Sequence, residues 1–136
     1  MNEIQNILNV TFPFVESLLK EYGEFYPLAS VAKTDNTVEQ LLNFETDENE
    51  FPKSTSIIES IKKELRLKQN EYIAIALFYK VKLKEENTDA IAVYVEHKLE
   101  NFAYTLYYPY EIIKNTTAFS DSWKTIEQME IFNTKK

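Results

Sequence analysis

Three consecutive segments alternate between apolar and other side chains, and this alternation constrains the fold more than any other feature of the sequence. The segments are residues 72–83, 90–99 and 102–110. A period of two is typical of β-strands that bury one face. The connections between the segments are short, so we expect antiparallel neighbours in one sheet. We further expect the odd-numbered residues of the first two segments to form the buried face.

The opposite face of this predicted sheet carries small side chains on its first two strands. These are Ala74, Ala76, Ala90 and Ala92. Small residues would let a helix or another protein chain approach the sheet closely. Because domains are built from packed layers of their own elements, a helix of the same chain is the favoured interpretation, and a partner chain is the alternative.

Apolar residues at helical spacing predict a first helix over residues 2–22. Pro13 interrupts the pattern, so either the helix kinks there or a second helix begins with Thr11 as its cap. Gly23, the only glycine of the chain, follows the last periodic residue. We expect Gly23 to adopt the left-handed conformation that ends many helices.

A second helix is predicted over residues 52–69, where Ser56 and Glu59 fit a capping box. Weaker periodicity over residues 120–126 predicts a short C-terminal helix. The acidic segment 45–50 is expected to be a solvated loop, because it lacks the glycine that an EF-hand calcium loop requires.

Two further strands are predicted over residues 25–33 and 37–44, joined by a turn at Asp35 and Asn36. The predicted order is α-β-β-α-β-β-β followed by a short C-terminal element. The length suits one domain, so residues 1–136 are expected to form a single α+β domain. Its core would be one antiparallel sheet of about five strands with two main helices.

The formal net charge of −7, from 15 basic and 22 acidic residues, bears on the choice of partner. Nucleic acids and anionic membranes attract basic faces, so neither is expected as a partner. An acidic surface favours solubility and encounter with a basic protein. The sequence has no apolar run long enough to span a membrane and no signal-peptide pattern at its start, so we expect a cytoplasmic protein.

The sequence lacks the signatures of common enzyme and cofactor sites. It has no cysteine, and its single glycine excludes a phosphate-binding loop. His97, the only histidine, could serve as a general base with Glu96 or Glu100 nearby. A regular strand places Glu96 on the opposite face from His97, so a structural role for His97 is favoured. We therefore expect no metal and no cofactor, and an enzyme is disfavoured.

Tyrosines are the most suggestive candidates for a binding surface. The third segment of the sheet contains Tyr104, Tyr107, Tyr108 and Tyr110, and Tyr94 lies on its neighbour. Tyrosine is enriched at protein interfaces, but half-buried tyrosines also occur in ordinary sheets. Packing within the sheet is favoured for most of them, and Tyr107 is the expected exception.

Three segments resemble motifs of a group of small bacterial proteins of largely unassigned function. Residues 18–29 (LLKEYGEFYPLA) resemble a G-E-F-Y-P-F-like motif that follows the first helix of that group, with Leu28 where phenylalanine is usual. Residues 89–97 (DAIAVYVEH) and residues 109–110 (PY) are similar to later strands of the group. Some of its members resemble immunity proteins encoded beside polymorphic toxins, so the resemblance implies an immunity role.

The resemblance also implies where matching residues lie, although it assigns no catalytic residue. Tyr26 would help to anchor the first helix to the sheet. Glu96 and His97 would gather with Pro109 and Tyr110 at one end of the sheet.

Three functional hypotheses follow from these observations. The first is a non-enzymatic protein-binding domain, in its narrower form an immunity protein that inhibits a basic toxin. The second is a small-ligand sensor or an unrecognised enzyme with a pocket near His97, and the third is a homodimeric scaffold, so the chain could be a monomer or a homodimer. The candidate binding residues are Tyr26, Tyr94, Glu96, His97, Tyr107 and Tyr110.

Overall fold

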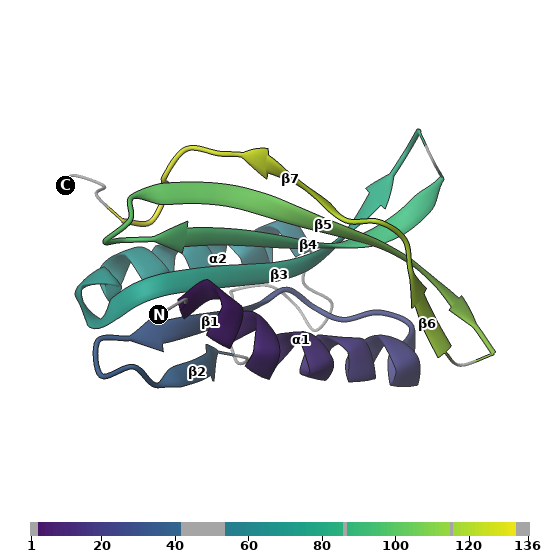
Figure 1. Ribbon diagram of the computed structural model, residues 1–136, viewed down its shortest axis with the longest axis horizontal. Helices are drawn as coiled ribbons and strands as arrows, with labels where there is room; N and C mark the ends of the chain where they lie inside the picture. Colours follow the sequence, from purple (N-terminus) through teal and green to yellow (C-terminus); the bar gives the residue numbers. More distant parts are fainter. Residues whose placement is uncertain (1–2, 42–53, 86, 115, 133–136) are drawn as a thin grey trace.

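A computed structural model describes residues 3–41, 54–85, 87–114 and 116–132, which form an α+β fold with one antiparallel sheet (Figure 1). In chain order the elements are α1 (Glu3–Tyr22), β1 (Leu28–Lys33), β2 (Val38–Leu41), α2 (Ser54–Leu67), the 3₁₀ helix η1 (Gln69–Glu71), β3 (Tyr72–Leu83), β4 (Thr88–His97), β5 (Phe102–Ile113), β6 (Thr116–Phe119) and β7 (Trp123–Ile126). The predicted α+β class and its two main helices are confirmed. The described residues contain seven strands, however, rather than about five.

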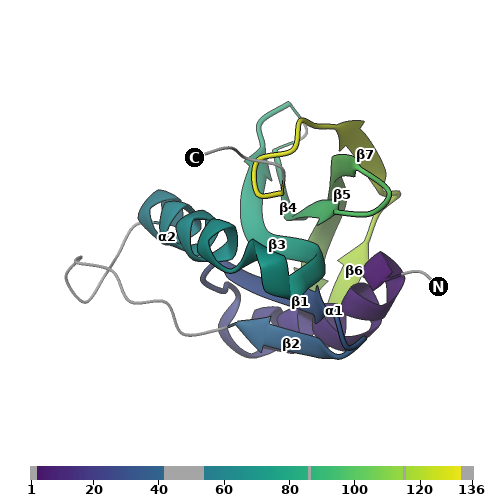
Figure 2. The same ribbon diagram turned by 90° about the vertical axis from the view of Figure 1, so that its left-hand side faces the viewer.

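The strands follow the order β2-β1-β3-β4-β5-β6, and β7 also pairs with β5. The sheet curls around α1, whereas α2 lies against the outer, convex face (Figure 2). The hairpin of β1 and β2 therefore forms one side of the sheet, and β6 and β7 form the other. Among the described helices, none is both long enough and apolar enough to cross a membrane.

Each face of the sheet carries even-numbered residues from one of the strands β3 and β4 and odd-numbered residues from the other. Phe78 lies opposite Val93, and Leu77 lies opposite Tyr94. Directly opposed residues in antiparallel strands share a face, so even residues of β3 lie with odd residues of β4. The expectation that odd residues of both strands form one buried face is therefore wrong. The register set by the connecting turn decides this, and alternation within each strand carries no information about it.

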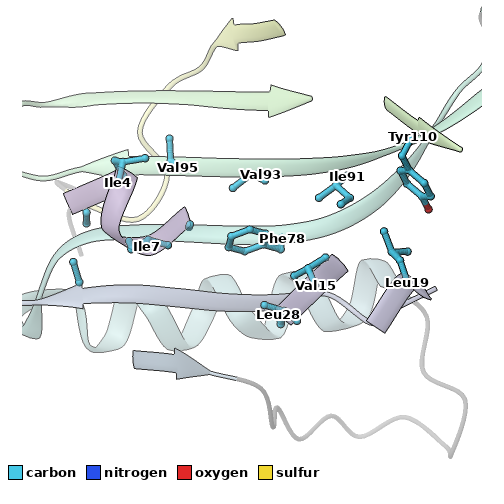
Figure 3. Close-up of a cluster of buried hydrophobic side chains, with 13 residues drawn as sticks. Ile4, Ile7, Val15, Leu19, Leu28, Phe78, Ile91, Val93, Val95 and Tyr110 are labelled. Carbon is cyan, nitrogen blue, oxygen red and sulfur yellow. The ribbon is translucent and has the colours of Figure 1, made fainter. Parts of the chain in front are cut away.

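Helix α1 covers the concave face of the sheet (Figure 3). Ile7 and Val15 of α1 are fully buried in one cluster with Phe78 of β3. Ala74 and Ala76 belong to the same cluster and leave space for the helix. The predicted covering of small residues by a helix of the same chain is thus confirmed for these two alanines.

Helix α2 packs on the convex face through Ile61 and Leu65, which are fully buried in a second cluster with Leu77. Ala90 and Ala92 also face this convex side, because they pair with Val81 and Tyr79 rather than lying beneath α1. They are buried but do not belong to the cluster that α2 forms. The four alanines of the predicted second face are therefore divided between the two faces.

Helix α1 continues through Pro13, so the alternative of a second helix beginning at Thr11 is wrong. Thr11 is buried instead, and its hydroxyl donates a 2.8 Å hydrogen bond to the hydroxyl of Ser30 on β1. The end of α1 is as predicted. Gly23 has a φ of 76°, and its amide donates a 2.8 Å hydrogen bond to the carbonyl of Leu19.

Strands β6 and β7 pair with the same side of β5 and are separated by a bulge. β6 ends opposite Tyr110 and β7 begins opposite Tyr107, so the three residues 120–122 face only two residues of β5. The amide of Ser120 donates to the carbonyl of Pro109 at 2.9 Å. The nitrogen of Pro109 faces the same side and has no hydrogen to donate, which the irregular pairing at the bulge accommodates.

The structure corrects three local predictions, one of an element's type and two of where an element begins. Residues 120–126 form the bulge and β7 rather than a short helix, because pairing with β5 outweighs weak helical periodicity. Ser56 lies inside α2, which already begins at Ser54, so the capping box does not start this helix. The first strand begins at Leu28 rather than at residue 25. The predicted acidic loop at residues 45–50 falls outside the described residues.

Candidate binding surfaces

Glu96 and His97 do not gather with Pro109 and Tyr110 at one end of the sheet. His97 ends the β4–β5 ladder on one side, and Asp89 pairs with Tyr110 at the other. At roughly 3.3 Å per residue, these two ends are about 25 Å apart. The implied gathering is therefore wrong, and the six candidate residues do not form one site.

Glu96 lies on β4, and its side chain is fully buried on the convex face. The backbone amides of Glu130, Ile131 and Phe132 donate hydrogen bonds to its carboxylate at 2.6, 2.9 and 3.0 Å. Hydrogen bonds to a charged acceptor are strong, and three of them compensate for the water that the carboxylate loses on burial. Glu96 therefore holds the C-terminal segment, residues 127–132, of its own chain.

Tyr94 supports the same contact from the neighbouring part of β4. Its hydroxyl donates a hydrogen bond to the Glu96 carboxylate and also lies 2.9 Å from the carbonyl oxygen of Gln128. Burial, followed by the hydrogen bond to Glu96, raises the pKa of Tyr94 above its ordinary value. The hydroxyl thus stays protonated and acts as a donor inside the protein.

Helix α2 fastens the C-terminal segment from the other side. The Nζ atom of Lys62 lies 2.9 Å from Oε1 of Glu130, and Nε of Arg66 donates a 2.9 Å hydrogen bond to the carbonyl of Glu130. Together with Glu96 and Tyr94, these contacts join α2, β4 and the C-terminal segment. The cluster is an internal joint rather than an open site.

His97 is buried on the concave face and is bound on both ring nitrogens. The amide of Glu100 donates a 3.1 Å hydrogen bond to Nδ1, so Nδ1 is the acceptor. Nε2 therefore carries the hydrogen and donates it to Glu3 Oε1 at 2.8 Å. The hydrogen bond from His97 is the largest of the effects that lower the pKa of Glu3. His97 thereby connects the end of β4 to the start of α1.

An open groove of about 840 Å³ lies beside His97, and its lining carries several charged side chains. These are Glu3, Glu100, Lys124 and Glu127. The side chain of His97 is only 4% exposed, so it contributes little to the groove surface. A general base needs a ring nitrogen that can accept a proton from substrate, and both nitrogens are already engaged. The geometry gives this groove little support as a catalytic site.

Tyr110 points from β5 toward Leu19 of α1 on the concave face (Figure 3). It is buried, and its hydroxyl makes no hydrogen bond to any residue that the structure describes. Burial raises the pKa of Tyr110 to about 12, and the charge of Asp89 adds to this effect. Tyr110 is therefore a core residue with an unsatisfied hydroxyl rather than an exposed contact residue.

Exposed apolar side chains lie along the outer edge of the sheet. This outer edge comprises the end of β5 together with β6 and β7. The members are Ile112, Ile113, Phe119, Trp123 and Ile126. They are five of the ten large apolar side chains that are exposed in the described residues. They share one edge rather than one face, because Trp123 lies opposite Tyr107 on the convex side, whereas Phe119 and Ile126 lie opposite Tyr110 and Tyr104 on the concave side. Exposed apolar side chains along the edge of a sheet are candidates for contact with another molecule.

Tyr107 belongs to this region through a contact with Trp123. The two rings stack with centroids 5.4 Å apart and planes at 25°, and Trp123 remains 42% exposed. The sequence predicts Tyr107 as a contact residue but not Trp123, because residues 120–126 are predicted to form a helix. Pro109 was the available signal, because a proline within a long strand indicates an edge or a bulge.

Tyr26 lies in the connection between α1 and β1 and is 56% exposed. It lines a second groove, which lies beside the C-terminal half of α1. This groove shares no residue with the groove beside His97 or with the outer edge.

Within the described ranges, no group of three or more acidic, histidine or cysteine side chains is placed to hold a metal ion. Comparison of the chain with models of known protein families, with curated proteins and with solved structures found no match.

Proposed function

We propose that this protein is a protein-binding domain that contacts a basic partner protein through the outer edge of its sheet. The observation that carries the proposal is the partly exposed Trp123 stacked on Tyr107, with further exposed apolar side chains along the same edge. Tryptophan and tyrosine supply much of the binding energy at protein interfaces because they bury a large area with few rotatable bonds.

The form of the outer edge favours contact through side chains over the addition of a further strand. β6 and β7 contain four residues each, and the bulge at residues 120–122 separates them. Short and irregular edge strands pair poorly with strands of another molecule. This supports a partner with its own complementary surface over a homodimer formed edge to edge.

The net charge indicates the chemistry of the partner. A charge of −7 accelerates encounter with a basic protein and slows encounter with an acidic one. The narrower form of the proposal is an immunity protein that masks a basic toxin, in agreement with the sequence resemblance. In this form the negative charge attracts the toxin, and the apolar side chains of the outer edge hold it.

Co-expression with the products of adjacent genes tests the proposal, with complex formation and protection from toxicity as the measurements. Trp123→Ala and Ile126→Ser should each weaken the complex by roughly tenfold or more, because they truncate exposed apolar contacts. Leu67→Ser and Leu99→Ser are matched controls, since both leucines are exposed away from the outer edge. No complex and no protection with any adjacent product would remove the immunity form. Equal losses in all four variants would remove the outer edge as the interface.

Light scattering distinguishes the homodimer alternative. A monomer at high protein concentration agrees with the proposal. A dimer that Ile126→Ser dissociates would instead assign the outer edge to a second copy of this chain.

A further inference from the structure

The second groove lies where the chain reverses direction after α1. Gly23, with its left-handed φ of 76°, turns the chain so that the following residues run back beside the helix. Phe14, Leu18 and Tyr22 contribute the helical side of the groove, at successive four-residue spacings on α1. Residues 24–28 contribute the other side. Its volume of about 490 Å³ lies within the usual range for small-ligand sites.

The lining of this groove combines aromatic rings with a single negative charge. Its aromatic residues are Phe14, Tyr22, Phe25 and Tyr26, and Glu24 is its one ionisable carboxylate. No lysine or arginine is among its lining residues within the described chain. A lining with four aromatic residues and one carboxylate suits a cation with an apolar surface.

Phe14 and Phe25 are partly buried and pack against the cluster on the concave face, whereas Tyr22 and Tyr26 are exposed. None of these rings belongs to a ring pair in the described part of the chain, whereas Phe12 contacts both Tyr108 and Phe119. Tyr22 is 66% exposed and Tyr26 is 56% exposed. Glu24 is exposed and forms no ion pair with another described residue.

We propose that this groove binds a small quaternary ammonium compound. The negative face of an aromatic ring attracts a cation, and quaternary ammonium groups in particular are recognised by several rings around the charge. A primary ammonium brings three N–H donors that need acceptors, whereas a quaternary ammonium brings none. Glu24 is the single carboxylate in the lining, so the groove suits a quaternary ammonium group better than a primary one. The carboxylate of Glu24 supplies the opposite charge.

Titration with choline, followed by the amide signals of the ¹⁵N-labelled protein, tests this site. The amide of Gly23 is a suitable reporter, because Gly23 is the only glycine of the chain and adjoins the groove. The neutral isostere 3,3-dimethylbutan-1-ol is the matched control ligand, since it keeps the shape of choline and removes the charge. We expect choline to give a saturable shift and the alcohol to bind at least roughly tenfold more weakly.

Substitutions in the groove distinguish attraction of the cation to the ring faces from simple apolar contact. Tyr26→Leu removes an aromatic face and keeps an apolar side chain, so choline should bind about fivefold more weakly. Tyr26→Phe keeps the face and should bind choline as the wild type does. Glu24→Gln should weaken choline binding by about fivefold or more, while Glu21→Gln, on the exposed last turn of α1, should not.

The substituted side chains are exposed, so these variants should keep the wild-type fold, which the remaining amide signals would show. Equal affinity for choline and the neutral alcohol would overturn the proposal in favour of an apolar ligand. No saturable shift with choline, or equal binding by Tyr26→Leu and Tyr26→Phe, would also overturn it. None of these results depends on whether the outer edge binds a protein, so the two proposals fail independently.

Discussion

The carboxylate of Glu96 accepts a 3.0 Å hydrogen bond from the backbone amide of Phe132, which lies 36 positions later in the chain. Both residues are buried, and the side chain of Phe132 belongs to the cluster beneath α2. The contact therefore does two things at once. It satisfies a charge inside the protein, and it holds an apolar side chain in the convex-face core.

Replacing Glu96 with glutamine should destabilise the protein by about 3 kcal/mol. The amide group of glutamine has one acceptor oxygen, and its NH₂ group would face backbone amides that also donate. Urea unfolding gives the free energy, and hydrogen exchange at Ile131 and Phe132 reports release of the C-terminal segment. Glu100→Gln is the control, since Glu100 is exposed. Unchanged stability with continued protection of both amides would contradict this role of Glu96.

A second prediction compares two tyrosine hydroxyls, one that is hydrogen-bonded and one that has no partner among the described residues. Tyr94→Phe removes a hydroxyl that is bonded to Glu96 and should cost about 1–3 kcal/mol of stability. Tyr110→Phe removes a buried hydroxyl that lacks a partner among the described residues, so it should leave stability unchanged or raise it slightly. The two substitutions delete the same atom, and thermal or urea unfolding compares them directly. A larger loss for Tyr110→Phe than for Tyr94→Phe would be contrary to the structure.

The sequence predicted the three long strands β3, β4 and β5 but could not predict which faces they share. Alternation within β3 and β4 is a local property, whereas the pairing of Phe78 with Val93 depends on the register across their turn. The partner of Glu96 was equally inaccessible, because the amides of Ile131 and Phe132 are distant in sequence and carry no side-chain signal.

The sequence did not predict the outer edge, for a related reason. Strands of four residues such as β6 and β7 are too short for alternation to identify, and Trp123 takes its place by pairing opposite Tyr107. Local features fared better. Gly23 was predicted at its left-handed position because that conformation follows from the residue type itself.

The contact between Glu3 and His97 should make stability depend on acidity. The pKa of Glu3 is lowered in the folded protein, first by the hydrogen bond from His97. Its contribution is therefore fully present above the ordinary value of 4.5 and is lost as the pH falls through the lowered folded value. Free energies of unfolding across this range should show Glu3→Gln less stable than the wild type at neutral pH, with the difference shrinking in acid. Glu21→Gln, which alters an exposed carboxyl, should parallel the wild type. A difference that stays constant with pH would show that Glu3 acts through packing alone.

Replacing Gly23 with alanine isolates the cost of a left-handed backbone. Apart from its two neighbours in the chain, no described residue has a heavy atom within 4 Å of a Cβ atom at this position, so the substitution introduces no clash. The φ of 76° alone should then cost roughly 1–2 kcal/mol, because the left-handed region is unfavourable for residues with a side chain. Gly23→Asn should cost less, since asparagine tolerates this region, as Asn36 does at a φ of 71°. Urea unfolding of both variants measures the difference. Equal stability of the alanine and glycine proteins would mean that the end of α1 relaxes to another conformation, which the amide signal of residue 23 would reveal.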